Sequence, residues 1–475
     1  MKTALSLLLF ISLLSCGSVV RPADKATKKL SSDYVFDLKS LPEIEIVVDA
    51  AEWDKLLEYY SANKENEEYI KADFNFIKDG KKEVLMNVGF RVRGNTFSRV
   101  SPEASSIHTP GNTKWQQSHF RVDFNLYVKG QSFHKLKALN LKAFNGDPAF
   151  VREIYCFDLF HRFGVNAAPK SSYVCLTIYI KGDPSPAYFG IYRMNESIDT
   201  TMMENRFPDE PVGYLWKCLY PANLIHASME EKIGMEKISA ESKQQSETFA
   251  YDLKTKKDEF DKAKKQLLDF AYSLNYLEGK ELKDWLEKSF EVQLFLKAYA
   301  VNVMVGMWDD YWINNNNYYL YQHVSGKWEF IPYDYDNTLG TFTGDINATS
   351  DVFDWGGGGL GWGGGSPERP LIDKILSIPE YRQAYSNYIA MLIDPSQGLF
   401  DAAASIARIK EWQTMIAPYI ENDTGSAQKI KDRPADWGHC HYYRLVTGED
   451  DLPAKEVNYF LQRIKYAKIQ LGIGQ

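Results

Sequence analysis

Two pairs of aspartates bracket a short stretch of the chain, residues 308–340, and could hold a metal ion. Asp309 and Asp310 stand near its beginning, and Asp334 and Asp336 stand near its end. If the chain folds back between them, several carboxylates share a small volume, which is costly unless a cation or proton holds them. Hard oxygen ligands such as aspartate and asparagine suit Mg²⁺. This pattern predicts a metal and phosphate site.

A β-hairpin is expected to position these acids. The aromatic segment Tyr318–Tyr321 and the alternating segment Trp328–Pro332 predict its strands, with Ser325-Gly326 near the turn. The residues from Leu282 to Val305 predict a single helix with a wide apolar face that delivers the chain to the first acid pair. A helix followed by a hairpin is a rigid platform for a site.

Two known ion or phosphate motifs are excluded. An EF-hand loop requires Asp-x-Asp-x-Asp-Gly, and Thr338-Leu339 stand in its last two places. The glycine-rich run at residues 355–365 lacks the lysine of a P-loop. We interpret that run as a mobile loop, the alternative being a lid over a ligand that uses its two tryptophans.

Length and charge set broad limits. The chain has 475 residues, enough for two or three domains or one large domain with insertions. Its net charge of −8 and pI of about 5.6 argue against a nucleic-acid partner.

The first 20 residues predict a targeting signal. Lys2 precedes an apolar segment, residues 4–14, that is too short to span a bilayer and ends in Leu-Leu-Ser-Cys-Gly. Those last residues resemble a bacterial lipobox, so we expect cleavage before Cys16, lipidation of that cysteine and a membrane-anchored lipoprotein of the cell envelope. The alternative is an ordinary secretory signal. Residues 21–40 are interpreted as a tether.

The remaining cysteines give no metal signature. Cys156, Cys175, Cys218 and Cys440 show no CxxC spacing, so a zinc site is not expected. The first three lie in apolar runs typical of a core, and no disulfide pairing is assigned.

The periodicity predicts an α+β protein with two parts. Residues 41–225 are expected to be β-rich with one embedded helix at residues 149–163, and residues 226–475 mainly helical around the hairpin. Residues 228–280 are charge-rich and predict surface helices. Further helices are expected at residues 51–60, 371–378, 381–392, 402–420 and 454–471.

Basic residues occupy two neighbouring predicted strands. Arg91 and Arg93 lie on the first, residues 84–94, and Arg121 lies on the second, residues 120–125. An antiparallel pair of these strands carries either solvated cross-strand charge or a face for phosphate, and both interpretations stay open.

Several blocks together resemble one known family. WDDYWINNNNYYLY followed by KWEFIPYDYDNTLG is similar to the signature of the CotH kinase family, the atypical kinases that include spore coat protein H. FRVRGNTFS, YFGIYRMNESID, GYLWK and PLIDKIL resemble family blocks in the same order, so the resemblance covers roughly residues 40 to 470. It implies a protein-kinase-like fold with a β-rich N-terminal lobe and a mainly helical C-terminal lobe. It also implies transfer of the ATP γ-phosphate to protein Ser/Thr with Mg²⁺ or Mn²⁺.

The resemblance assigns roles on the hairpin. Asp309 is the candidate catalytic base, with its neighbour Asp310 as the alternative, and Asp336 with Asp334 takes the metal-binding role. Asn314 has the spacing of the metal-binding asparagine in ordinary kinases, whereas Asn317 aligns better with the family block, and both remain candidates.

Upstream residues supply the expected nucleotide contacts. Lys217 is the candidate phosphate-contacting lysine, and Glu153 is expected to orient it. Arg93 or Arg121 is expected at the phosphates, and Glu196 near the adenine. The alternative for each is an ordinary surface salt bridge.

These expectations describe an exported, lipid-anchored kinase at the periplasm or cell surface. Its partners would be a nucleotide, a protein substrate and, through Cys16, a membrane. The alternative function is a surface lipoprotein on the same scaffold that binds a protein or carbohydrate without turnover.

Overall fold

A computed structural model provides the fold. It describes residues 32–94, 99–103, 115–236, 249–341, 348–355, 368–425, 429–432, 445–446 and 458–473. The signal with Cys16, the glycine-rich run after residue 355 and Cys440 lie outside the described residues.

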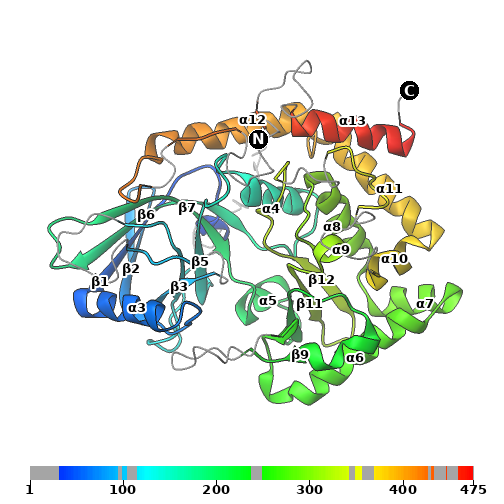
Figure 1. Cartoon of the computed structure of the whole chain (residues 1–475), viewed down its shortest axis with the longest axis horizontal. Coiled ribbons are helices and arrows are strands. Elements are labelled where there is room, and N and C mark those ends of the chain that lie inside the picture. Colours follow the sequence, from blue (N-terminus) through cyan, green and yellow to red (C-terminus); the bar gives the residue numbers. More distant parts are fainter. Residues whose placement is uncertain are drawn as a thin grey trace, which may run out of the picture.

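Seven strands in the N-terminal part form a closed barrel, on the left of Figure 1. The barrel closes because β1 pairs with β2 on one side, antiparallel, and with β6 on the other, parallel. The order around it is β1-β2-β3-β4-β5-β7-β6. The bounds are β1 Glu43–Asp49, β2 Ile70–Lys78, β3 Lys81–Arg93, β4 His119–Asp123, β5 Ala138–Ala143, β6 Ser171–Lys181 and β7 Ala187–Glu196.

Alternation of apolar side chains builds the barrel interior. On β1, Ile44, Ile46 and Val48 are buried while their neighbours are more exposed, as the period of two predicts. Trp53 of helix α3 (Ala50–Ala62) packs edge-on against Trp115, 5.7 Å between ring centroids. The β-rich character expected for this part is confirmed, although β2 was not among the predicted strands.

A second sheet of five strands carries the hairpin. Its order is β12-β11-β8-β10-β9. The predicted hairpin is confirmed, since β11 pairs antiparallel with β12 and Gly326 adopts a left-handed φ of +90° between them. The other edge of β11 pairs with β8, so the hairpin is part of a larger sheet. The bounds are β8 Tyr214–Cys218, β9 Ile233–Gly234, β10 Tyr251–Leu253, β11 Tyr318–Gln322 and β12 Trp328–Pro332.

Two local predictions were wrong. The single helix expected from Leu282 to Val305 is two helices, because Phe290 is extended and forms a β-bridge with Trp328. The amide of Glu291 then donates to the Trp328 carbonyl over 2.8 Å. Residues 228–280 contain β9 and β10 as well as helix, because β10 pairs with β8 and β9 pairs with β10, and charge-rich composition does not reveal these partners.

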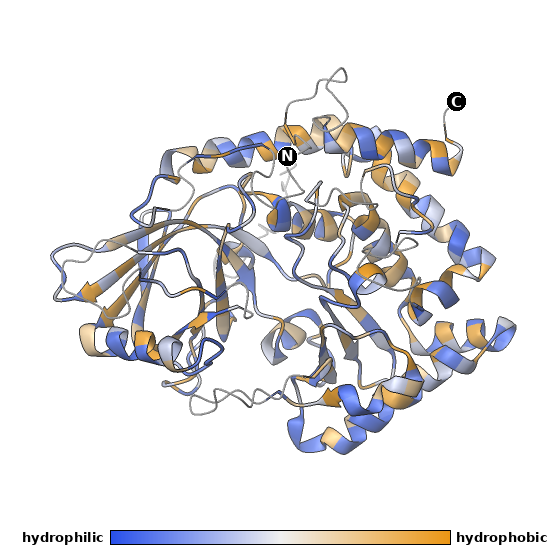
Figure 2. Ribbon diagram, viewed as in Figure 1, coloured by the Kyte–Doolittle hydropathy of each residue, from blue (hydrophilic) through white to orange (hydrophobic). Residues whose placement is uncertain are grey.

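Most of the remaining helices lie on the side of the second sheet, and α12 runs across the top above the barrel (Figure 1). Helix α8 is buried along most of its length, whereas α12 buries only one side, with Ile409, Trp412 and Ile416 at helical spacing. Accordingly, α12 shows mixed hydrophilic and hydrophobic colours in Figure 2 and runs along the outside of the molecule in Figure 1. The α-helices outside the barrel region are α4 Arg152–Arg162, α5 Thr200–Arg206, α6 Phe260–Tyr276, α7 Gly279–Ser289, α8 Val292–Val305, α9 Tyr311–Asn314, α10 Pro370–Leu376, α11 Pro379–Ile393, α12 Ala402–Ile416 and α13 Tyr459–Leu471. A one-turn helix, α2 Ser32–Val35, precedes the barrel.

The architecture is therefore α+β, as predicted, with a closed barrel as its N-terminal part. Among the described helices, none has the length and apolar character needed to cross a bilayer. The expected core position of Cys156, Cys175 and Cys218 is confirmed, because all three are buried free thiols.

Candidate functional site

The first acid of the hairpin region, Asp309, is surrounded by side-chain amides. Helix α8 ends at Gly306, whose left-handed backbone turns the chain toward it. The Nδ2 atoms of Asn314 and Asn316 donate to one carboxylate oxygen over 2.6 and 3.1 Å. That of Asn317 donates to the other oxygen over 2.9 Å. Both asparagines that the sequence left as alternatives thus contact Asp309.

Burial raises the pKa of Asp309, an effect that the amide donors oppose. The nearby charge of Asp334 raises this pKa further, so the two ends of the hairpin region interact electrostatically. A deprotonated carboxylate held in a fixed orientation is suited to accept a proton from a hydroxyl group.

Its neighbour Asp310 has a structural role. The Asp310 side chain caps helix α9 by accepting the Ile313 amide over 2.8 Å. Its other oxygen accepts from Nδ2 of Asn302 over 2.5 Å, and Oδ1 of Asn302 accepts from the Tyr335 hydroxyl over 2.7 Å. Burial raises the pKa of Asp310 to about 7. Asn302 thus joins the segment that carries Asp309 to the segment that carries Asp334 and Asp336.

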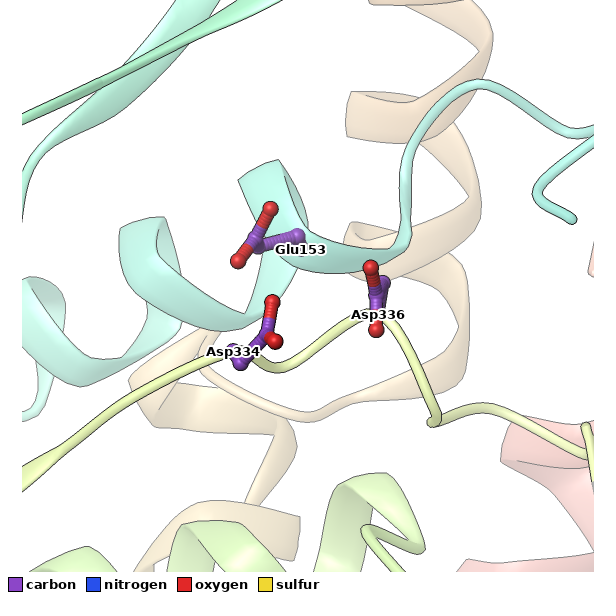
Figure 3. A group of neighbouring side chains, drawn as sticks. All are labelled: Glu153, Asp334 and Asp336. Atoms are coloured by element: carbon purple, nitrogen blue, oxygen red, sulfur yellow. The ribbon is translucent and has the colours of Figure 1, made fainter. Parts of the chain in front are cut away.

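Three further carboxylates converge across the fold. Glu153 from the first turn of α4 lies beside Asp334 and Asp336 from the segment after β12 (Figure 3). One carboxylate oxygen from each lies within 4.8 Å of the others. Glu153 is buried, whereas the side chains of Asp334 and Asp336 are 30% and 25% exposed and so accessible to a ligand.

A lysine of the barrel lies among these three acids. Nζ of Lys142, on β5, is 3.0 Å from Glu153 Oε2 and 3.2 Å from Asp336 Oδ2, and it also pairs with Asp334. Arg193 on β7 adds a second cation, 3.1 Å from Glu153 and 3.4 Å from Asp336. Two cations thus face three carboxylates.

The two aspartates differ electrostatically. Burial favours a raised pKa for Asp334, but the adjacent Lys142 outweighs it and holds the pKa at about 2. Burial raises the pKa of Asp336 to about 6, opposed by Lys142 and reinforced by the charge of Asp334. Asp334 therefore carries the more persistent negative charge of the pair.

The donor set fits a hard divalent cation. The acidic trio offers only carboxylate oxygens, the ligands that Mg²⁺ and Mn²⁺ prefer. Asn337 follows Asp336 in the sequence, and its buried amide oxygen, Oδ1, accepts no hydrogen bond within the described part of the chain. The residues present therefore suit such an ion.

The predicted pairing of Lys217 with Glu153 was wrong. Lys217 lies on β8, where β10 and β11 flank it, and its Nζ sits 5.8 Å from the centre of the Tyr333 ring. Glu153 pairs instead with Lys142 and Arg193. Sequence reasoning missed both cations, although a lysine between the apolar residues Leu141 and Ala143 was a usable signal, because a buried lysine requires an acidic partner.

The other residues predicted to contact the nucleotide are Arg93, Arg121 and Glu196, and each has different partners in the structure. Arg93 donates to the Tyr333 hydroxyl over 3.3 Å and so bridges the barrel to the segment leading to Asp334. Arg121 donates to Tyr69, Asn140 and Ser197 over 2.8 to 3.0 Å. Glu196 pairs with Arg206 and accepts the Lys170 amide over 3.0 Å. Arg121 and Glu196 are thus held by contacts within the protein.

A comparison with models of known protein families identifies the family of the chain. The family model described as CotH kinase protein matches residues 90–460, most of the chain. The chain belongs to the CotH kinase family. The matched region contains Lys142, Glu153, Asp309, Asp334 and Asp336. Membership in the CotH kinase family suggests a kinase-like phosphotransferase. A search of curated proteins found no match.

Proposed function

We propose that the protein is an exported, lipid-anchored protein kinase that transfers the γ-phosphoryl group of ATP to Ser or Thr with Mg²⁺ or Mn²⁺. The observation that carries this proposal is the Lys142–Glu153 ion pair beside Asp334 and Asp336, with Asp309 on the preceding segment. Phosphoryl transfer depends mainly on positioning and on neutralising charge, and this arrangement supplies both.

Each lobe of a kinase-like fold has a counterpart in this proposal. The barrel takes the place of the small lobe and provides Lys142. The second sheet and its helices take the place of the large lobe and provide Asp309, Asp334 and Asp336. The nucleotide would lie between them, near Arg93 and Lys217.

Each residue of the site has a separate role in the proposed reaction. Lys142 would bind the phosphates, and Glu153 and Arg193 hold its ammonium group and the neighbouring acids in place. Asp334 and Asp336 would hold the divalent ion, with Asn314 or Asn317 as the further candidate ligand. A bound ion would neutralise charge on the phosphates. Asp309 would accept the proton of the acceptor hydroxyl as the hydroxyl oxygen bonds to the γ-phosphorus and the bond from that phosphorus to ADP breaks.

Nucleotide binding and phosphate transfer test this proposal separately. Mg·ATP at 100 times its dissociation constant should stabilise the purified protein by about 2.7 kcal/mol. Asp309→Asn should abolish transfer of radiolabelled phosphate while keeping this stabilisation, and Asp336→Asn should also abolish transfer. Asp269→Asn, on the exposed surface of α6, is the matched control. Transfer that survives both site variants would refute the site assignment.

A purely binding function would give a different result. A protein without turnover would show no transfer with any nucleotide–metal pair, although it could still bind a protein or carbohydrate. Absence of both transfer and nucleotide stabilisation in the wild-type protein would therefore overturn the kinase proposal.

A further inference from the structure

Asn337 links the segment that carries Asp334 and Asp336 to the candidate base Asp309. It follows Asp336 directly, and its Nδ2 atom donates to Oδ2 of Asp309 over 3.5 Å. Asn337 is only 9% exposed. One buried side chain thus connects the segment after β12 to Asp309.

The contact with Asp309 determines which way the amide faces. A carboxylate accepts hydrogen bonds and offers none when ionised, so the nitrogen of Asn337 must face Asp309 and the oxygen must face away. That oxygen, Oδ1, is buried and has no hydrogen-bond partner among the described residues. An unsatisfied buried acceptor costs about 1–3 kcal/mol, so this oxygen requires an explanation.

Asn316 provides the contrast. Its Nδ2 also donates to Asp309, over 3.1 Å, but its Oδ1 already accepts the Tyr220 amide over 3.0 Å. Both asparagines contact Asp309, but the oxygen of Asn316 already accepts a hydrogen bond, whereas that of Asn337 has no partner within the described part of the chain.

We propose that Asn337 is a further ligand of the divalent ion, bound through Oδ1, and that it couples the ion to the orientation of Asp309. This inference rests on the proposed ion site at Asp334 and Asp336. A neutral amide oxygen adds a hard ligand without adding charge to a cluster that already contains three carboxylates. An ion held by this oxygen also fixes the amide nitrogen against Asp309.

Titration with Mn²⁺, followed by the electron paramagnetic resonance of free Mn²⁺, tests the ligand role without measuring activity. Asn337→Leu should weaken Mn²⁺ binding by roughly 10-fold or more, the size of effect typical for losing a supporting contact at a metal site. Asn337→Asp keeps an oxygen in place and should retain binding. Asn316→Leu removes an equivalent donor to Asp309 and should leave Mn²⁺ affinity unchanged.

The outcomes separate this inference from the proposed function. Unchanged Mn²⁺ affinity in Asn337→Leu would overturn the ligand role, and so would an equal loss in Asn316→Leu, since the loss would then come from releasing Asp309. If Asp336→Asn leaves Mn²⁺ affinity unchanged, or the wild-type protein binds no Mn²⁺, the ion site of the proposed function fails as well. Where Asn337→Leu does not fold, the Mn²⁺ affinities of Asn337→Ser and Asn337→Asp are compared instead. The serine side chain is too short to place its oxygen at the same position, so Asn337→Ser should bind Mn²⁺ more weakly than Asn337→Asp, and equal affinities would overturn the ligand role.

Discussion

Nζ of Lys142 lies 3.0 Å from Oε2 of Glu153, and this ion pair joins strand β5 of the barrel to the first turn of helix α4. Their side chains are 8% and 1% exposed, so neither charge is well solvated. Buried charges of this kind persist only with close partners. The pair therefore sets the position of a cation beside Asp334 and Asp336.

Removing the Lys142 ammonium should affect both stability and nucleotide binding. Lys142→Met leaves the three carboxylates with Arg193 alone, and breaking a buried ion pair costs about 3–5 kcal/mol. We expect a free energy of unfolding lower by about that amount, measured by urea denaturation, and loss of the Mg·ATP stabilisation. Lys217→Met is the comparison variant, because Lys217 lies near the proposed nucleotide position but contacts the Tyr333 ring, whereas Lys142 contacts the three acids. A larger effect of Lys217→Met would show that the phosphate-binding lysine is on β8.

Replacing Asn302 should destabilise the protein more than removing the Tyr335 hydroxyl. Asn302→Leu removes both hydrogen bonds of Asn302, so that Asp310 Oδ2 loses its donor and the Tyr335 hydroxyl loses its acceptor. Tyr335→Phe removes a single hydrogen bond, the one that Asn302 Oδ1 accepts. An unsatisfied buried neutral group costs about 1–3 kcal/mol, and a charged one costs more. Urea denaturation at pH 8 should show at least twice the loss for Asn302→Leu. Equal losses would mean that the link to Asp310 contributes little.

His161, in the last turn of α4, should make the protein sensitive to acid. Burial lowers its pKa to about 4, reinforced by the charge of Arg206. Because the folded pKa is below the unfolded value of about 6.5, the unfolded state binds the proton more readily, and stability is lost as pH falls from 6.5 toward 4. The loss should reach about 3 kcal/mol.

Thermal or urea unfolding between pH 4 and 8 checks this. His161→Gln, whose amide keeps a donor for the Pro169 carbonyl, should lose less stability than the wild-type protein over this range. Parallel pH profiles for the two proteins would rule out His161 as the source.

Membrane association should depend on Cys16. In a bacterial host that processes lipoproteins, Cys16→Ala should move the protein from the membrane fraction to the soluble fraction or block its processing, because acyl chains supply the anchor in the proposed function. Cys440→Ala is the matched control and should remain with the membrane. Retention of Cys16→Ala on membranes, correctly cleaved, would contradict the lipobox interpretation.

The sequence by itself determined the features that depend on local order. The alternating strands, the short turn at Ser325-Gly326 and the acids before and after them predicted the hairpin, because side-chain period and turn chemistry act over a few residues. The helix carrying Glu153 was predicted for the same reason.

Only the tertiary structure decided which distant residues meet. Lys142 reaches Glu153 because β5 lies between β4 and β7 in the closed barrel, a pairing that no local pattern specifies. The break between α7 and α8 likewise follows from the bridge of Phe290 to Trp328. A buried lysine selects its partner by proximity and by the cost of leaving its charge unpaired, and proximity is a property of the folded chain.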